Sequence, residues 1–147
     1  MSACDYVTFR VGEQQCAVDA SAVQNVFYPR GMAQVPLAPP EIVGIMGLRG
    51  KLVTIVCART RLGLPPRADG PAPIAIGLDL AGDSYGLLVD AVGEVLKFDA
   101  GELQAPPGAL PPRWADSVRA VCQLQGELLL ILDAARLLER PAIENAA

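Results

Sequence analysis

Four cysteines are the side chains best suited to chemistry in this sequence, but their spacing favours no site. Cys4, Cys16, Cys57 and Cys122 form no CxxC pair, and the chain contains no histidine. Structural zinc sites use clustered cysteine and histidine ligands, so the sequence predicts no metal site. Free cysteine is among the most buried residue types, and we expect the four thiols to be reduced core residues.

The lack of histidine also removes the commonest catalytic arrangements. Ser-His-Asp and Cys-His nucleophile pairs both need an imidazole base. Neither a GxxxxGK[ST] phosphate loop nor a GxGxxG turn occurs. Carboxylates or a lone thiolate remain as a means of catalysis, and nothing in their spacing indicates one. We therefore expect a non-enzymatic protein without a cofactor.

Charge is unevenly distributed along the 147 residues, which carry a formal net charge of −4. Residues 42–68 contain no acidic side chain and five basic ones: Arg49, Lys51, Arg59, Arg61 and Arg67. The rest holds seven basic and sixteen acidic residues, a balance of −9. A basic segment on an acidic body suits an acidic protein partner better than nucleic acid, whose binders are basic overall. The alternative is a solvated face with ordinary loop charges.

The length predicts one domain, or one domain in two halves. Hydrophobic residues make up 52% of the chain, yet its longest apolar runs, such as 128–132, are short. A membrane-spanning helix needs about 20 apolar residues. The N-terminus has neither a basic start nor an apolar signal core. We expect a cytoplasmic protein with no direct membrane insertion.

Short strands separated by proline and glycine dominate the expected secondary structure. Strands are predicted at 6–11, 16–18, 52–57, 74–80, 85–89 and 128–132. Asp19 or Ser21 is expected to cap a short helix through Val26. The strand at 52–57 is continuously apolar, which indicates burial on both faces. Proline-rich loops are expected at 29–40 and 105–112, a linker near 65–73, and a final helix at 134–140 before Pro141.

An internal repeat organises these elements. Residues 47–58 and 123–134 share Leu, Gly, Leu, Ile and Ala at the same offset, and each copy precedes a short helical stretch and a proline. Val18-Asp19-Ala20 likewise matches Val89-Asp90-Ala91. The repeat, approximately 6–65 and 74–141, predicts two similar small β-barrels within one domain, 1–147. Barrels also remove exposed sheet edges, which so many short apolar strands would otherwise present.

The two copies diverge at two informative positions. Arg49 precedes the turn glycine in the first copy, where the second has Gln125. A structural repeat has no need for that arginine, so Arg49 is a candidate for contact with a partner. Cys57 stands where the second copy has Asp133.

Residues 44–56, Gly-Ile-Met-Gly-Leu-Arg-Gly-Lys-Leu-Val-Thr-Ile-Val, resemble the CheW family of chemotaxis coupling proteins. The family signature there is a glycine, three residues, Leu-Arg-Gly, and a strand ending in Val-Ile-Asp-Leu-Arg. Further similarity lies in 6–9, 18–26, 86–95 and 126–138. The resemblance therefore covers almost the whole chain, from about Tyr6 to Glu139, in the family's order.

This resemblance implies an adaptor of two SH3-like five-stranded β-barrels with short helices. Such adaptors bind the CheW-like regulatory domain of the histidine kinase CheA and the cytoplasmic hairpin tip of chemoreceptors. By position, Val23 on the short helical segment falls on the kinase contact. Gly44, Arg49, Val92 and Val95 fall on a receptor-facing groove between the barrels. Arg49 would clamp a carboxylate of the receptor tip, and the two valines would be apolar anchors. Ordinary core packing is the alternative for the valines, and an exposed turn residue for Arg49.

The sequence departs from the family pattern at four positions: Asn25, Gly47, Thr54 and Cys57. These departures allow a diverged paralogue that serves another array, such as one controlling surface motility or a second-messenger enzyme. Two other hypotheses remain. Cys57 would be the reactive thiol of a redox sensor or enzyme, if Arg59 and Arg61 lowered its pKa. The basic segment 49–67 would bind single-stranded nucleic acid, although it lacks the aromatic residues on which bases stack.

Overall fold

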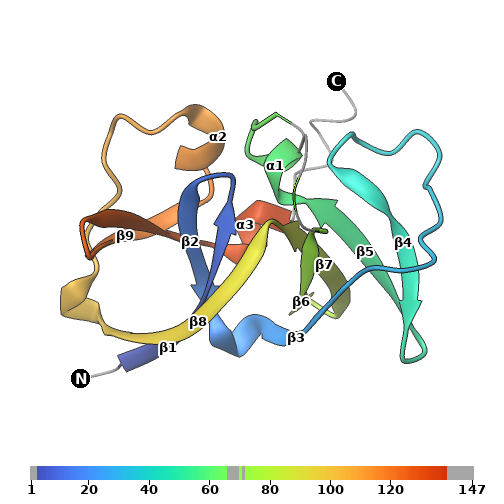
Figure 1. Cartoon of the computed structure of the whole chain (residues 1–147), viewed down its shortest axis with the longest axis horizontal. Coiled ribbons are helices and arrows are strands. Elements are labelled where there is room, and N and C mark those ends of the chain that lie inside the picture. Colours follow the sequence, from blue (N-terminus) through green and yellow to red (C-terminus); the bar gives the residue numbers. More distant parts are fainter. Residues whose placement is uncertain (1–2, 66–69, 71, 139–147) are drawn as a thin grey trace.

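The computed structural model describes residues 3–65, 70 and 72–138, and strands dominate this part of the chain (Figure 1). The strands are β1 (Ala3–Val11), β2 (Gln14–Asp19), β3 (Val23–Phe27), β4 (Ile42–Leu48), β5 (Lys51–Cys57), β6 (Ile74–Leu80), β7 (Asp83–Val89), β8 (Ala91–Asp99), β9 (Val118–Leu124) and β10 (Glu127–Leu132). Short helices connect them: α1 (Ala58–Arg61), α2 (Pro112–Ala115), α3 (Ala134–Leu138) and the 3-10 turns η1 (Ala20–Ala22) and η2 (Ala100–Glu102). The predicted mainly β fold is confirmed.

The strands form two five-stranded mixed sheets. Sheet A has the order β8-β1-β2-β10-β9, and sheet B has the order β3-β6-β7-β5-β4. Adding five to each strand number of sheet B, and counting on from β10 to β1, gives the order of sheet A. The parallel contacts, β10 with β2 and β5 with β7, also correspond. The predicted pair of similar five-stranded units is therefore present in the topology.

Neither sheet, however, is built from one half of the sequence, as the repeat alone would suggest. Sheet A combines β1 and β2 with the late strands β8, β9 and β10, and sheet B combines β3, β4 and β5 with β6 and β7. The chain passes from one sheet to the other after β2 and again after β7. The two halves of the chain therefore interlock, and residues close in sequence lie on different sheets.

Three apolar clusters hold this arrangement together. The largest takes residues from both sheets, including Phe9 and Val18 of sheet A and Ile76 and Leu87 of sheet B. A second packs on the other face of sheet A around Tyr6, Phe98, Leu129 and Ile131. A third packs on the other face of sheet B around Met46, Val53 and Ile55. Burial of this apolar surface is the main stabilising contribution to the fold.

The helix predicted through Val26 is wrong. Asp19 does cap a turn, since its side chain accepts a hydrogen bond from the Ser21 amide, but η1 ends at Ala22. Val23 instead begins β3, which pairs with β6. Short apolar runs are ambiguous between helix and strand, and here the available ladder partner decides.

Several other expectations need revision or fall outside the described residues. The predicted burial of 52–57 on both faces fails at Leu52, which lies beside the hairpin tip and is 74% exposed. Strands β4, β8 and β9 were not among the predicted strands. The end of the final helix at 139–140 and the linker positions 66–69 and 71 lie outside the described residues. In the described part, no helix is long and apolar enough to cross a membrane.

Candidate functional site

Arg49 lies in the two-residue turn between β4 and β5, with an exposed side chain. Its φ angle is 54° and that of Gly50 is 81°. Two positive φ angles are typical of a type I′ turn, which matches the twist of a hairpin but disfavours most side chains at its first position. Gln125 and Gly126 repeat this backbone between β9 and β10, with φ angles of 50° and 80°. The hairpin geometry thus accounts for the positive φ angles in both turns. The Arg49 guanidinium is what distinguishes the β4–β5 turn from the β9–β10 turn.

A hollow of about 160 Å³ opens beside this turn, with Arg49, Lys51, Asn25 and Asp79 among its lining residues. The Asp79 carboxylate accepts a hydrogen bond of 3.0 Å from the Ser84 hydroxyl. Arginine keeps its charge and presents a planar fork, so Arg49 can bind a carboxylate through two hydrogen bonds. The rim therefore suits an acidic group on a partner.

Gly44 is buried in β4, beneath the loop that follows β3. A Cβ at this position would lie 2.9 Å from the Ala33 carbonyl oxygen and 3.2 Å from the Met32 Cβ. Ala33 and Ile45 exchange two backbone hydrogen bonds of 2.8 Å, which close this edge of sheet B. Gly44 thus has a structural role, because it lets the loop approach the strand closely.

Val92 and Val95 lie on β8, the edge strand of sheet A beside β1. Val95 is 59% exposed, whereas Val92 is half-buried against the inter-sheet core. Gly93 lies between them, and a Cβ there would come within 2.6 Å of the Thr8 hydroxyl oxygen. That hydroxyl donates a hydrogen bond of 2.7 Å to the Glu94 carbonyl. Val95 is thus exposed on the edge strand, and Val92 is partly a core residue.

Val23 is the first residue of β3, the edge strand of sheet B at the opposite end from β4. It is half-buried, opposes Leu78 of β6 and packs on the inter-sheet core. The correction from helix to strand places this residue on a strand edge, where its outer backbone side faces away from β6.

The four residues predicted to face the receptor do not share one hollow. Arg49 belongs to the hollow of sheet B, whereas Val92 lines a separate one with Thr8 and Gly93. Figure 1 shows β4 at the far right of the molecule and β8 to the left of centre. The structure therefore places Gly44 and Arg49 on one sheet and Val92 and Val95 on the other.

Comparison with known proteins connects this architecture to a family. The CheW-like domain matches residues 5–142 of the chain. The chain belongs to the CheW family. Chemotaxis protein CheW of Rhizobium meliloti is 26% identical over 129 residues, which cover 88% of this chain and 83% of the relative. Chemotaxis protein CheW of Bacillus subtilis is 23% identical over 140 residues, with 95% and 90% covered.

A solved structure agrees with the fold of this CheW-family chain. The crystal structure of the scaffolding protein TtCheW from Thermoanaerobacter tengcongensis matches with a TM-score of 0.83 and 25% identity. The match covers 95% of this chain and 94% of that one. The family consists of non-enzymatic chemotaxis scaffold proteins, and the two-sheet architecture described above is its fold.

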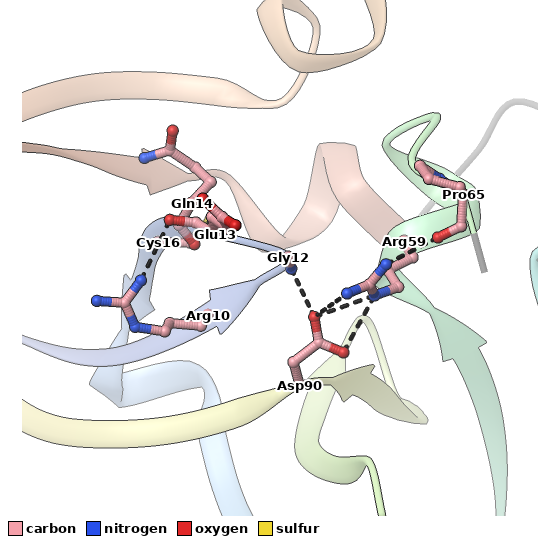
Figure 2. Close-up of polar contacts among 8 residues, drawn as sticks. All are labelled: Arg10, Gly12, Glu13, Gln14, Cys16, Arg59, Pro65 and Asp90. Carbon is pink, nitrogen blue, oxygen red and sulfur yellow. Dashed lines mark hydrogen bonds and ion pairs between the residues drawn. The ribbon is translucent and has the colours of Figure 1, made fainter. Parts of the chain in front are cut away.

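Two arginines of the basic segment 42–68 have partners within the protein. Figure 2 shows Arg59 against Asp90, with Nε 3.1 and 3.0 Å from the two carboxylate oxygens and Nη2 3.0 Å from Oδ2. Arg61 is 3% exposed and donates hydrogen bonds to the Leu137 and Arg136 carbonyls at 2.6 and 3.0 Å. Arg67 lies outside the described residues. These cations are close in sequence, but in the fold Arg59 pairs with Asp90 and Arg61 is buried against α3.

The thiol hypothesis for Cys57 requires Arg59 and Arg61 to direct their positive charge toward the thiol. Cys57 is half-buried at the start of α1, and Arg59 and Arg61 both point to other partners. The burial expected of the thiols holds for Cys16 and Cys122, whereas Cys4 is exposed. Burial raises the pKa of Cys16 to about 12, and burial followed by the charge of Glu102 raises the pKa of Cys122. These shifts disfavour the thiolate in both.

Asp90 is the residue of interest that sequence reasoning missed. It joins β7 of sheet B to β8 of sheet A, and it holds Arg59 and the Gly12 amide together. The sequence signal that could have identified Asp90 is a single carboxylate between two apolar strand segments, within the Val-Asp-Ala match of the repeat. Its partner Arg59 stands at the arginine of the family's Val-Ile-Asp-Leu-Arg signature.

Proposed function

We propose that this chain is a coupling adaptor that links chemoreceptors to a CheA-type histidine kinase and catalyses no reaction itself. The observation that carries the proposal is the CheW-like match over residues 5–142. The adaptor would act in the cytoplasm, at the inner face of the membrane, where chemoreceptor arrays assemble. Its partners would be the kinase regulatory domain and the receptor's cytoplasmic tip.

The receptor contact would use both sheets. Arg49, exposed beside a hollow, would hold a carboxylate of the receptor tip, and Val95 would supply an apolar anchor. Gly44 and Val92 would act indirectly, since Gly44 lets the loop at Ala33 pack closely on β4 and Val92 is half-buried. A coiled-coil hairpin with acidic and apolar surface has the chemistry to meet this pair of features.

The kinase contact would use β3 alone. Val23 lies at the start of this edge strand, and the neighbouring Val26 is 42% exposed. An apolar residue at a strand edge suits a partner that is itself built from small sheets, as the CheW-like regulatory domain of the kinase is.

Calorimetric titration tests both contacts on the full chain. The kinase regulatory domain should bind the wild type, and Val23→Asp should abolish binding while the near-isosteric Val23→Thr weakens it. A receptor-tip peptide should bind the wild type but not Arg49→Glu. Gln125→Glu is the matched control, because Gln125 has the same backbone in the equivalent hairpin. Absence of binding to both partners at high micromolar concentration would refute the adaptor function.

A second candidate is an adaptor of the same kind in another chemosensory array, such as one controlling surface motility or a second-messenger enzyme. It is motivated by the departures from the family pattern at Asn25, Gly47, Thr54 and Cys57, the last of which leaves α1 without the side-chain cap that Asp133 gives α3. Titration against the regulatory domain of each CheA-type kinase from the same cell separates the two candidates. The tightest binding partner identifies the array.

A further inference from the structure

The proposed receptor surface is divided between two sheets, so its shape depends on how the sheets are joined. Val95 projects from β8 of sheet A, whereas Arg49 lies at a hairpin tip of sheet B. A rigid partner such as a helical hairpin can engage both only if the sheets keep a fixed relative orientation. The connections between the sheets therefore bear on recognition as well as on stability.

Asp90 is the link through which the chain passes from sheet B to sheet A. Strand β7 ends at Val89 and β8 begins at Ala91. The Asp90 amide donates a hydrogen bond of 3.0 Å to the Arg10 carbonyl, and the Asp90 carboxylate accepts one from the Gly12 amide. Backbone and side chain of Asp90 both attach to β1 and its turn, which belong to sheet A.

Arg59 ties the same carboxylate to sheet B. It lies in α1, directly after β5, and its guanidinium reaches both Asp90 oxygens at 3.0 to 3.1 Å (Figure 2). Its Nη1 also donates a hydrogen bond of 2.8 Å to the Pro65 carbonyl. The two side chains are 22% and 15% exposed, so water screens this ion pair less than an open surface pair.

The other crossover between the sheets differs. Asp19 occupies the matching place at the end of β2, but its carboxylate accepts a hydrogen bond from the Ser21 amide within its own turn. The comparison indicates that the Asp90 crossover does more than turn the chain. At Asp90 the carboxylate joins the turn after β1 of sheet A to α1, which follows β5 of sheet B.

We propose that Arg59 and Asp90 are positioning residues for the receptor contact. They hold β8, with Val92 and Val95, in a fixed place relative to the sheet that carries Gly44 and Arg49. This inference rests on the proposed function. It adds that the receptor site has one part on each sheet, and that the Arg59–Asp90 ion pair holds the two parts in position. The kinase contact needs no such link, because Val23 lies on β3 of sheet B alone.

The test compares Asp90→Ala and Arg59→Ala with wild type in the full chain. Calorimetry measures affinity for the receptor-tip peptide and for the kinase regulatory domain, and residual dipolar couplings of backbone amides measure the relative orientation of the sheets. Each substitution should weaken receptor binding roughly three- to thirtyfold and change the orientation. Kinase binding should stay within about twofold of wild type. The double variant should lose little more than either single variant.

Glu127→Gln is the control, because it removes the Arg10–Glu127 pair, which lies within sheet A at 3.7 Å. It should leave both affinities and the orientation unchanged. Asp90→Asn and Arg59→Lys retain hydrogen bonding, and they supply the same readouts if the alanine variants fail to fold.

Wild-type receptor affinity in folded variants would overturn the inference. So would a loss of affinity with unchanged sheet orientation, since Asp90 would then act as a direct contact. If wild type itself fails to bind the receptor tip, the proposed function fails. The couplings then still show whether the ion pair holds the sheets.

Discussion

The segments β4–β5–α1 and β9–β10–α3 are copies of one structure, separated by 76 residues. Their strand registers coincide, including the irregularity that precedes Val56 in one copy and Leu132 in the other. A loop residue bridges the outer strand at Ile45 in the first and at Val121 in the second. Cys57 and Asp133 even donate backbone hydrogen bonds of the same 2.7 Å, to Glu41 and Ser117.

Against this common backbone, the side chains differ at the turn, the helix cap and the helix end. In the alignment of the two copies, Arg49 is equivalent to Gln125, Cys57 to Asp133, and Arg61 to Leu137. Buried strand positions stay apolar in both, such as Ile55 and Ile131. The comparison separates residues that the fold requires from those that one copy has acquired. Exchanging residues between the copies tests each difference.

The largest effect is expected at the turn. Arg49→Gln gives the first hairpin the residue of the second, and it should weaken receptor-tip binding by about 2–4 kcal/mol, as loss of an interface arginine hot spot does. The backbone already accepts glutamine at this φ, so unfolding free energy should not change. Gln125→Arg should gain no receptor binding. Calorimetry and thermal melts measure both, and equal affinities for wild type and Arg49→Gln would remove Arg49 from the contact.

The helix end comes second. Arg61 is buried, and its guanidinium donates to the Arg136 and Leu137 carbonyls at the end of α3. Arg61→Met should cost about 1–3 kcal/mol of unfolding free energy, because the two carbonyls lose the hydrogen bonds that the buried guanidinium donates. Urea unfolding measures the loss. The exposed Arg113→Met, which loses one hydrogen bond to the Thr60 carbonyl, should cost clearly less.

Gly44 and Ala120 give the third contrast. They occupy the same register position in β4 and β9, and a Cβ added at the glycine would lie 2.9 Å from the carbonyl oxygen of the loop residue Ala33. Gly44→Ala should destabilise the protein by roughly 1–2 kcal/mol through overpacking. Ala120→Gly should cost about 0.5–1 kcal/mol through added flexibility of the unfolded chain. Chemical denaturation measures both, and a cost at Gly44 no larger than at Ala120 would contradict the close approach.

These contrasts also show which features the sequence could reveal. The matching Leu, Gly, Leu, Ile and Ala predicted the duplicated hairpin, since turn and core residues are read from local pattern. The exchange of strands between the sheets was not predictable, because no local signal says which hairpin β1–β2 will lie beside. For the same reason the sequence did not show that Arg59 and Arg61, within the basic segment 42–68, have partners inside the protein. Their partners, Asp90 and the end of α3, are distant in sequence.

The smallest expected effect is at the helix cap. The Asp133 carboxylate accepts hydrogen bonds from the Ala135 and Arg136 amides at 3.0 and 3.3 Å, whereas Cys57 gives α1 no such bond. Cys57 already has the extended backbone of an N-cap, with φ −83° and ψ 116°. Cys57→Ser keeps the side-chain shape and supplies a capping oxygen, so it should raise unfolding free energy by about 0.5–1 kcal/mol.

Asp133→Ala is the companion to that substitution and should lower unfolding free energy by about 1 kcal/mol. Thermal melts of both variants measure how far the two copies can be made alike. A neutral or destabilising Cys57→Ser would mean that the thiol's packing beside Leu88 outweighs a cap in this copy. In that case the cysteine is retained for its apolar contact, and the uncapped α1 is held by the hydrogen bonds of Arg59 and Arg61 instead.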